Sequence, residues 1–356
     1  MTKSRHIDIL LRMLVIKGAS DLHVQVDTPP IFRVHGLLSF SDLEPVSDED
    51  IESYVYSIMN AEQKRRFEEF QHIDLSYAVP GVSRFRVNVY RQRGNIGTAM
   101  RVIPFETPTI EQWGLPPVIR DLASKPHGLV VVTGPAGSGK STTLAAVVDY
   151  INNARKGHVI TIEEPIEFLY QNKSCLINQR EVGLDTDSFS SALRDALRED
   201  PDVIMVGEMR DLDTISNAIT AAETGHLVFA TLHTNSAAQT VDRMIDVFPP
   251  HQQSQIRAQL AATLQGVVAQ QLVRKKDGTG RVAAFEIMLA NPAIRNLIKD
   301  SKTNQIETVI QTSAQEGMKL LRDSLKDLCR QNVITEEEAL TKVSDPRAFK
   351  EMLKTL

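Results

Sequence analysis

Hydrophobic residues in the first hundred positions alternate between helical and strand-like spacing. Ile7, Leu10 and Leu14 recur at the period of a helix over residues 7–16, and Gly18 is placed to end it. Two further helices are predicted over 49–59 and 61–70, and strands over 21–26, 31–34, 73–78, 83–90 and 97–103. Residues 1–103 are therefore predicted to form a small α+β domain built on an antiparallel sheet.

A different pattern begins after a proline-rich stretch. Residues 104–117 contain four prolines, and we interpret them as a linker or hinge before a second domain over 118–356. In that second part, short apolar runs separated by helical segments occur at 129–132, 158–162, 203–206 and 227–232. Alternating strands and helices are typical of an α/β fold with a parallel sheet.

The C-terminal third is predicted to be mainly helical. An apolar stripe over residues 252–273 predicts one long helix, which a basic loop over 274–281 follows. Shorter helices are predicted at 293–299, 315–328, 335–343 and 347–353. We expect these to form a helical subdomain over about 290–356.

Composition narrows the class of protein. The 356 residues carry 45 acidic and 40 basic side chains, a net charge of −5, which argues against a dedicated nucleic-acid-binding surface. Cys175 and Cys329 are far apart and exclude a four-cysteine zinc site, and they suggest reduced thiols in a cytoplasmic protein. No apolar run is long enough to span a membrane, and the N-terminus does not resemble a signal peptide. Any association with a membrane is expected to go through a partner.

A glycine-rich stretch directly follows the strand at 129–132. It matches G-x-x-x-x-G-K-[ST], the phosphate-binding P-loop, and Thr142 then begins a predicted helix over 142–151. The matching residues are Gly134, Pro135, Ala136, Gly137, Ser138, Gly139, Lys140 and Ser141, and these together with Thr142 are the expected nucleotide-binding residues. Backbone amides in such a loop point into one concavity at a helix N-terminus, which suits the phosphates of ATP. Lys140 is expected to reach the β- and γ-phosphates, and the Ser141 hydroxyl is expected to hold Mg²⁺.

Polar side chains follow the other three strands. Glu163 comes after the second strand, Glu208 after the third and His233 after the fourth. Because the carboxyl ends of parallel strands meet at one edge of a sheet, we expect these side chains to share a cavity with the P-loop. Glu208 is our candidate for the base that activates the attacking water, and Glu163 is a second candidate, for water or for hydrated Mg²⁺. His233 is expected to contact the γ-phosphate, whereas His226 precedes its strand and is expected at the opposite end.

These motifs resemble the secretion ATPase superfamily and, within it, the type IV pilus retraction ATPases. The resemblance extends from Gly18 to nearly the end of the chain, and its motifs occur at 134–142, 160–167, 178–183, 192–202, 206–211, 221–226, 230–235 and 293–298. It implies a RecA-like ATPase domain with a parallel-strand core, a preceding PAS-like α+β domain, C-terminal helices, ATP with Mg²⁺, and a hexameric ring. It also implies an Asp box at 163–167, a Walker B motif at 202–208 and a His box at 226–233. Glu164 departs from the aspartate usual in the family, and the extra methylene is expected to shift the Asp-box carboxylate.

The resemblance further implies a function and a set of partners. Arg86 and Arg101 match the family's trans-acting arginines and would reach the γ-phosphate held by a neighbouring subunit, with Arg84 as the nearest competitor for that role. The implied activity is an ATP-hydrolysing hexameric motor for pilus retraction and twitching motility. Its expected partners are an inner-membrane pilus platform protein and a second retraction ATPase. The expected location is the cytoplasm, at the inner membrane through those partners.

Three alternatives remain open at this stage. The first is an accessory retraction ATPase of the same pilus, although residues 293–298 favour the main retraction enzyme. The second is a RecA-like DNA translocase, which would require DNA stimulation and a steep salt dependence of binding. The third is a scaffold that binds nucleotide without hydrolysing it.

Overall fold

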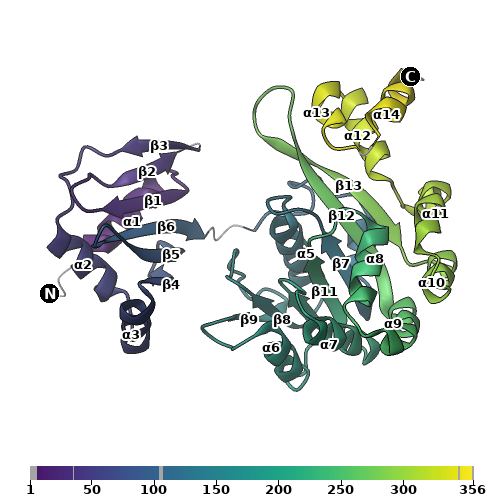
Figure 1. Ribbon diagram of the computed structural model, residues 1–356, viewed down its shortest axis with the longest axis horizontal. Coiled ribbons are helices and arrows are strands. Elements are labelled where there is room, and N and C mark those ends of the chain that lie inside the picture. Colours follow the sequence, from purple (N-terminus) through teal and green to yellow (C-terminus); the bar gives the residue numbers. More distant parts are fainter. Residues whose placement is uncertain (1–5, 35, 104–106, 344, 355–356) are drawn as a thin grey trace. The chain divides into compact units, whose positions relative to one another are not determined.

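The computed structural model describes residues 6–34, 36–103, 107–343 and 345–354, and divides into two compact units (Figure 1). The first comprises the chain before Thr107 together with Glu167–Leu169, and the second comprises the rest. Part of the predicted hinge, residues 104–106, lies outside the described residues. Ile110 and Leu115, which lie in the rest of it, are buried in the core of the second unit. The hinge therefore remains a prediction.

The first unit is a six-stranded antiparallel sheet with three helices. The elements are α1 (His6–Ile16), β1 (Asp21–Gln25), β2 (Ile31–Val34), β3 (Leu37–Phe40), α2 (Asp48–Ser57), α3 (Ala61–Phe70), β4 (His72–Val79), β5 (Ser83–Gln92) and β6 (Asn95–Ile103). The strand order is β3-β2-β1-β6-β5-β4. The predicted α+β domain is thereby confirmed. Strand β3 was not predicted because all four of its residues are exposed and show no alternation.

The two faces of this sheet differ in character. Successive strand residues point to opposite faces, so Leu22 and Phe85 pack with the helices in one apolar core. Asp21, Arg86 and Arg101 are each next in sequence to a core residue, and therefore lie on the opposite, polar face. Antiparallel sheets commonly bury only one face, and this arrangement follows that rule.

The second unit contains a seven-stranded sheet ordered β13-β12-β7-β11-β10-β8-β9. Its strands are β7 (Gly128–Thr133), β8 (Gly157–Glu163), β9 (Cys175–Glu181), β10 (Val203–Val206), β11 (Leu227–Leu232), β12 (Leu264–Arg274) and β13 (Arg281–Leu289). The strands β12, β7, β11, β10, β8 and β9 pair in parallel, and β13 runs antiparallel to β12. All four strands predicted for the parallel sheet are confirmed.

Helices cover both faces of that sheet (Figure 1). The helices are α4 (Val118–Ala123), α5 (Lys140–Ala154), α6 (Phe189–Ala196), α7 (Leu212–Glu223), α8 (Ala237–Asp246), α9 (Pro250–Thr263), α10 (Pro292–Lys299), α11 (Ile306–Thr312), α12 (Leu321–Arg330), α13 (Glu336–Leu340) and α14 (Pro346–Lys354). Leu129 and Val131 of β7 face the core formed with α6 to α11, while Val130 and Val132 face the core formed with α4 and α5. The unit is therefore a three-layer α/β fold with β7 in its interior.

The prediction of one helix over 252–273 is wrong. Helix α9 ends at Thr263, and the chain continues directly as β12, between β7 and β13. Strand β12 is buried on both faces, so it lacks the alternation that identifies a half-exposed strand. Gly266 allows the close packing, since a β-carbon there would lie 2.9 Å from Met288 O and 3.1 Å from Leu122 Cδ2.

The C-terminal helices pack in two places. Ile294 of α10 and Ile306 of α11 belong to the main core, whereas α12, α13 and α14 surround a small core at the far end of the β12–β13 hairpin (Figure 1). That small core consists of Val273, Ala284, Leu325, Ile334, Ala339 and Phe349. Within the described part of the chain, no helix combines the length and apolar character needed to cross a bilayer.

Candidate phosphate-binding and catalytic site

The glycine-rich loop connects β7 to α5, as predicted. Gly134, Gly137 and Gly139 have φ angles of 145°, 73° and 90°, a region in which other residues are strained. A β-carbon at Gly134 would lie only 2.3 Å from Gln270 O. Gly139 is the N-cap of α5 and has no side chain with which to cap it. The first amides of this helix are thus not capped by a side chain, as an anion-binding site requires.

Lys140 and Ser138 face the interior of the loop. The Lys140 ammonium donates to Gly134 O at 2.9 Å and to Pro135 O at 3.1 Å, and the residue is 9% exposed. The Ser138 hydroxyl oxygen is buried and has no hydrogen-bond partner among the described residues. A phosphate oxygen could accept a hydrogen bond from the Ser138 hydroxyl, because a buried hydroxyl is costly without a partner.

The predicted strand-end residues lie at the same edge of the sheet as the P-loop. Parallel register places the ends of β7, β8, β10 and β11 together. Glu163 is the last residue of β8, and Glu208 and His233 come just after β10 and β11. The ends are joined by hydrogen bonds. Thr133 Oγ1 donates to Thr234 O at 2.8 Å, and Gly207 N donates to Ile162 O at 2.7 Å.

Glu208 lies between an arginine and a histidine. Its Oε1 is 2.9 Å from Arg210 Nε and 3.1 Å from His233 Nε2, and its side chain is 19% exposed. Burial acts to raise the pKa of Glu208, but the hydrogen bond from Arg210 and the nearby His233 outweigh it and lower that pKa overall. The carboxylate is therefore ionised at neutral pH, as a group that orients or activates water must be.

Glu163 is buried at the end of β8. Its Oε1 accepts from Thr161 Oγ1 at 2.8 Å and from Gln179 Nε2 at 3.2 Å, and the residue is 6% exposed. Glu163 and Glu208 thus occupy different environments, one buried beside Thr161 and Gln179 and the other beside Arg210 and His233. Two carboxylates can take separate roles when their surroundings differ in this way.

Three residues that the sequence analysis did not identify support the P-loop. Gln270 Nε2 donates to Ser138 O at 2.6 Å, Thr143 Oγ1 donates to Gln270 Oε1 at 2.7 Å, and Trp113 Nε1 donates to Thr143 Oγ1 at 3.1 Å. Gln270 was missed because its strand was interpreted as helix. The β-branched pair Val267–Val268 beside Gly266 was the available signal for a strand.

The predicted trans-acting arginines lie on the polar face of the first unit. Arg86 of β5 and Arg101 of β6 lie directly opposite each other. Arg101 Nε donates to Asp21 Oδ1 at 2.7 Å, and Arg86 Nε lies 3.8 Å from Asp74 Oδ1. A pocket of about 260 Å³ is lined by Asp21, Asp74, Arg86, Asn88, Ala99 and Arg101. Like charges placed opposite each other destabilise a sheet, and Asp21 and Asp74 offset the charges of this arginine pair.

The other predicted histidine and the competing arginine lie elsewhere. His226 precedes β11, and its Nδ1 is 3.0 Å from Ala221 O, so it lies at the end of the strand opposite His233, as expected. Arg84 hydrogen-bonds the Ser76 hydroxyl through Nε.

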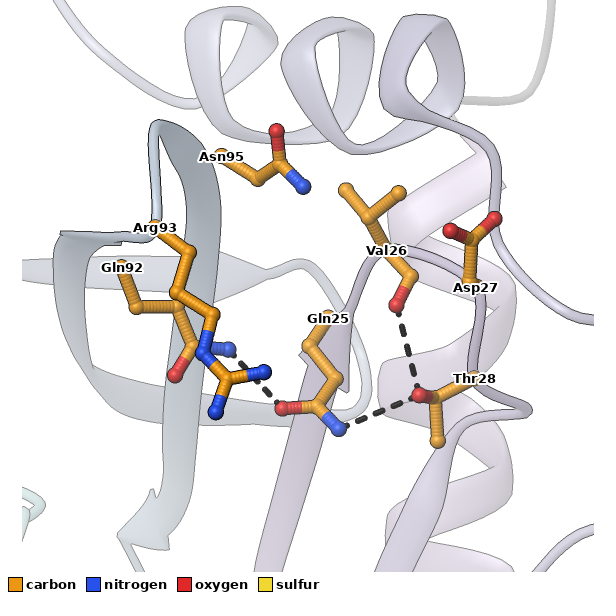
Figure 2. A pocket seen from close by; sticks show the side chains of 7 residues that line it. All are labelled: Gln25, Val26, Asp27, Thr28, Gln92, Arg93 and Asn95. Atoms are coloured by element: carbon orange, nitrogen blue, oxygen red, sulfur yellow. Dashed lines mark hydrogen bonds between the residues drawn. The ribbon is translucent and has the colours of Figure 1, made fainter.

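A second pocket of the first unit contains none of the predicted site residues. Figure 2 shows it between the turn after β1 and the turn that joins β5 to β6. Its volume is about 490 Å³, and its lining is Gln25, Val26, Asp27, Thr28, Gln92, Arg93 and Asn95. Gln92 Nε2 donates to Gln25 Oε1 at 3.0 Å, and Gln25 Nε2 donates to Thr28 Oγ1 at 3.1 Å, which links the two turns (Figure 2).

Comparisons with known proteins agree with this geometry. Residues 114–341 match the family model described as "Type II/IV secretion system protein". The chain is 51% identical to the "Type IV pilus retractation ATPase PilT" of Pseudomonas aeruginosa, over 96% of this chain and 98% of that protein. It is 40% identical to the "Type IV pilus ATPase PilU" of the same organism, over 97% and 90% of the two chains. The crystal structure of "the Pilus Retraction Motor PilT and Bound ADP" superposes with a TM-score of 0.91 at 45% identity, covering 96% of this chain and 98% of that one.

Proposed function

Because the chain belongs to the Type II/IV secretion system protein family, we propose that it is the ATP-hydrolysing motor of type IV pilus retraction. One observation carries this proposal. The P-loop, Glu208 and His233 lie at the same edge of one parallel sheet, as a phosphoryl-transfer site requires.

The loop residues would bind the nucleotide. The uncapped start of α5 and the unpartnered Ser138 hydroxyl fit a polyphosphate, and Lys140 would exchange its two loop carbonyls for β- and γ-phosphate oxygens. Ser141, beside Lys140 in the first turn of α5, is the residue that we expect to hold Mg²⁺. When bound, Mg²⁺ would neutralise part of the phosphate charge.

The strand-end residues would carry out hydrolysis. Glu208 would orient the attacking water and accept its proton, since its carboxylate is ionised and only partly exposed. His233, which contacts Glu208, would also contact the γ-phosphate and respond to its loss. Glu163 would act at a greater depth, through water held beside the phosphates.

The active site would be completed by a second subunit. Arg86 and Arg101 lie in the first unit, where, among the described residues, Asp74 and Asp21 of the same sheet lie beside them. In a hexameric ring with head-to-tail contacts, they would stabilise the charge on a neighbour's γ-phosphate, and residues 104–117 would act as the hinge.

The remaining assignments follow the family. The expected partners are an inner-membrane pilus platform protein and a second retraction ATPase, with the motor in the cytoplasm at that membrane. Identity to the PilT relative, at 51%, exceeds identity to the PilU relative, at 40%, and favours the main retraction enzyme over the accessory one.

Subunit mixing tests the shared site. Glu208→Gln should bind ATP without releasing phosphate, and the double variant Arg86→Ala/Arg101→Ala should also be inactive. Mixed rings should recover phosphate release, because some interfaces would then join an intact Glu208 to intact arginines. No recovery on mixing would show that each site is built within one chain.

A cell-based assay tests the motor function. The wild-type chain should restore twitching to a strain that lacks its retraction ATPase, and Glu208→Gln should not. Restoration by Glu208→Gln would separate retraction from hydrolysis and contradict the proposal.

A further inference from the structure

The loop after β10 carries an arginine that joins two strand ends. Arg210 Nε lies 2.9 Å from Glu208 Oε1, and Arg210 Nη1 lies 3.0 Å from Glu164 Oε2. We propose that Arg210, held in place by Glu164, is a positioning residue that fixes the Glu208 carboxylate for attack of water on the terminal phosphate. This inference rests on the proposed ATPase function and assigns residues that act through Glu208.

Arg210 and His233 contact the same oxygen of Glu208, Oε1. Two contacts to the same oxygen, from a loop and from the end of β11, restrict rotation of the carboxylate. A fixed carboxylate keeps the water in line with the phosphate, and this alignment is a large part of catalysis.

Glu164 determines where Arg210 lies. Glu164 follows β8, so its contact with Arg210 ties the loop after β10 to the neighbouring strand end. Its side chain is 43% exposed and that of Arg210 is 59% exposed, so the ion pair alone contributes little to stability. The contact therefore serves geometry more than stability. An aspartate at this position would be shorter by about 1.5 Å and would lose the contact unless the backbone moved.

The charges around Glu208 are consistent with this role. Arg210 and His233 face it directly, and Glu164 offsets part of the Arg210 charge from the far side of the guanidinium. Arg210 thus both orients Glu208 and lowers the pKa of its carboxyl group. Replacing the arginine should disturb each effect, and the two effects can be measured separately.

The experiment compares steady-state ATP hydrolysis across pH for the full-length protein. Arg210→Gln should lower kcat about tenfold or more, with KM for ATP changed less than about twofold, because the lost contact acts on the attacking water. The acidic limb of its kcat profile should move to higher pH, since Glu208 loses its main cationic partner. Arg210→Lys keeps the positive charge but cannot contact Glu208 and Glu164 together. The acidic limb of its kcat profile should therefore stay at the wild-type pH, and its kcat should recover only in part.

A double-mutant cycle tests the role of Glu164. Glu164→Gln should lower kcat by a smaller factor than Arg210→Gln, and combining the two should cause no further loss, because both act through one contact. Independent losses that multiply, an unchanged kcat in Arg210→Gln, or an unmoved acidic limb would each overturn the proposal. If Arg210→Gln melts below the assay temperature, Arg210→Lys and Glu164→Gln make the same comparison.

The chain offers a matched control. Arg65 in α3 also lies between two glutamates, 2.5 Å from Glu62 and 3.5 Å from Glu69, and its side chain is 66% exposed. Arg65→Gln should leave kcat and its pH profile unchanged. Failure of the proposed function would look different, since the wild-type protein would then not hydrolyse ATP or Glu208→Gln would remain active.

Discussion

Asp21 of β1 and Arg101 of β6 lie directly opposite each other, and Arg101 Nε donates a 2.7 Å hydrogen bond to Asp21 Oδ1. The Asp21 side chain is only 10% exposed, whereas that of Arg101 is 66% exposed. A buried carboxylate therefore holds an exposed guanidinium by its Nε. Its terminal nitrogens can then point away from the sheet.

Replacing this carboxylate should weaken both fold and activity. Asp21→Asn should lower the free energy of unfolding by about 1–2 kcal/mol, less than for a fully buried pair because Arg101 is exposed. It should also lower kcat, since Arg101 loses its fixed direction. Chemical denaturation and phosphate release measure the two effects. Asp27→Asn, at an exposed turn residue, is the control, and equal effects of the two variants would contradict the prediction.

Gln270 offers a test of how the P-loop is supported. The residue is 1% exposed, and Gln270→Ala would remove the partners of Ser138 O and Thr143 Oγ1. We expect a loss of about 1–3 kcal/mol in the free energy of unfolding and a weaker affinity for ATP. Calorimetric titration of nucleotide would measure the affinity. Gln265→Ala on the same strand removes only an exposed contact and should change neither quantity.

The change in stability caused by Gly266→Ala has opposite signs in a strand and in the predicted helix. In a helix, Gly266→Ala would stabilise the protein by up to about 1 kcal/mol. In β12 the new methyl group would meet Met288 O at 2.9 Å, so we expect a destabilisation of about 1–3 kcal/mol. Thermal unfolding of the variant gives the sign directly, and an increase in melting temperature would disagree with the structure.

Glu286 should make stability depend on pH. Burial raises the pKa of Glu286, although the carboxylate accepts a 2.7 Å hydrogen bond from Ala237 N at the start of α8. The folded protein therefore binds this proton more tightly than the unfolded chain does. The contribution of Glu286 to stability should fall as pH rises above 4.5, its ordinary value, through the raised pKa.

The variant Glu286→Gln isolates that effect. It should become more stable relative to the wild-type protein as pH rises from about 4 to 7, because the amide has no charge to bury. Urea denaturation at several pH values measures the difference. A difference that does not depend on pH would show that Glu286 keeps its ordinary pKa.

The sequence was most informative where a local signal was sufficient. The strands β7, β10 and β11 are short apolar runs between helices, and the P-loop glycines sit where their positive φ angles are needed. Parallel order then placed Glu163, Glu208 and His233 at one edge. Those predictions needed no knowledge of distant contacts.

Contacts between distant segments could not be predicted. Strand β12 carries an apolar stripe that also fits a helix, and only its pairing with β7 and β13 decides the matter. The Gln270–Ser138 contact depends on that pairing and was lost with it. The contact between Arg210 and Glu164 joins loops 46 positions apart, and no periodicity encodes it.

Strand β12 also has a mechanical consequence. Gln270 hydrogen-bonds the P-loop, and Val273 is buried among α12 to α14. The two residues lie three positions apart, or about 10 Å along one extended strand. A displacement of those terminal helices would be transmitted to the P-loop along the extended backbone of β12, without first deforming the main hydrophobic core. A protein that binds the C-terminal helices would therefore be coupled to the affinity of the P-loop for nucleotide.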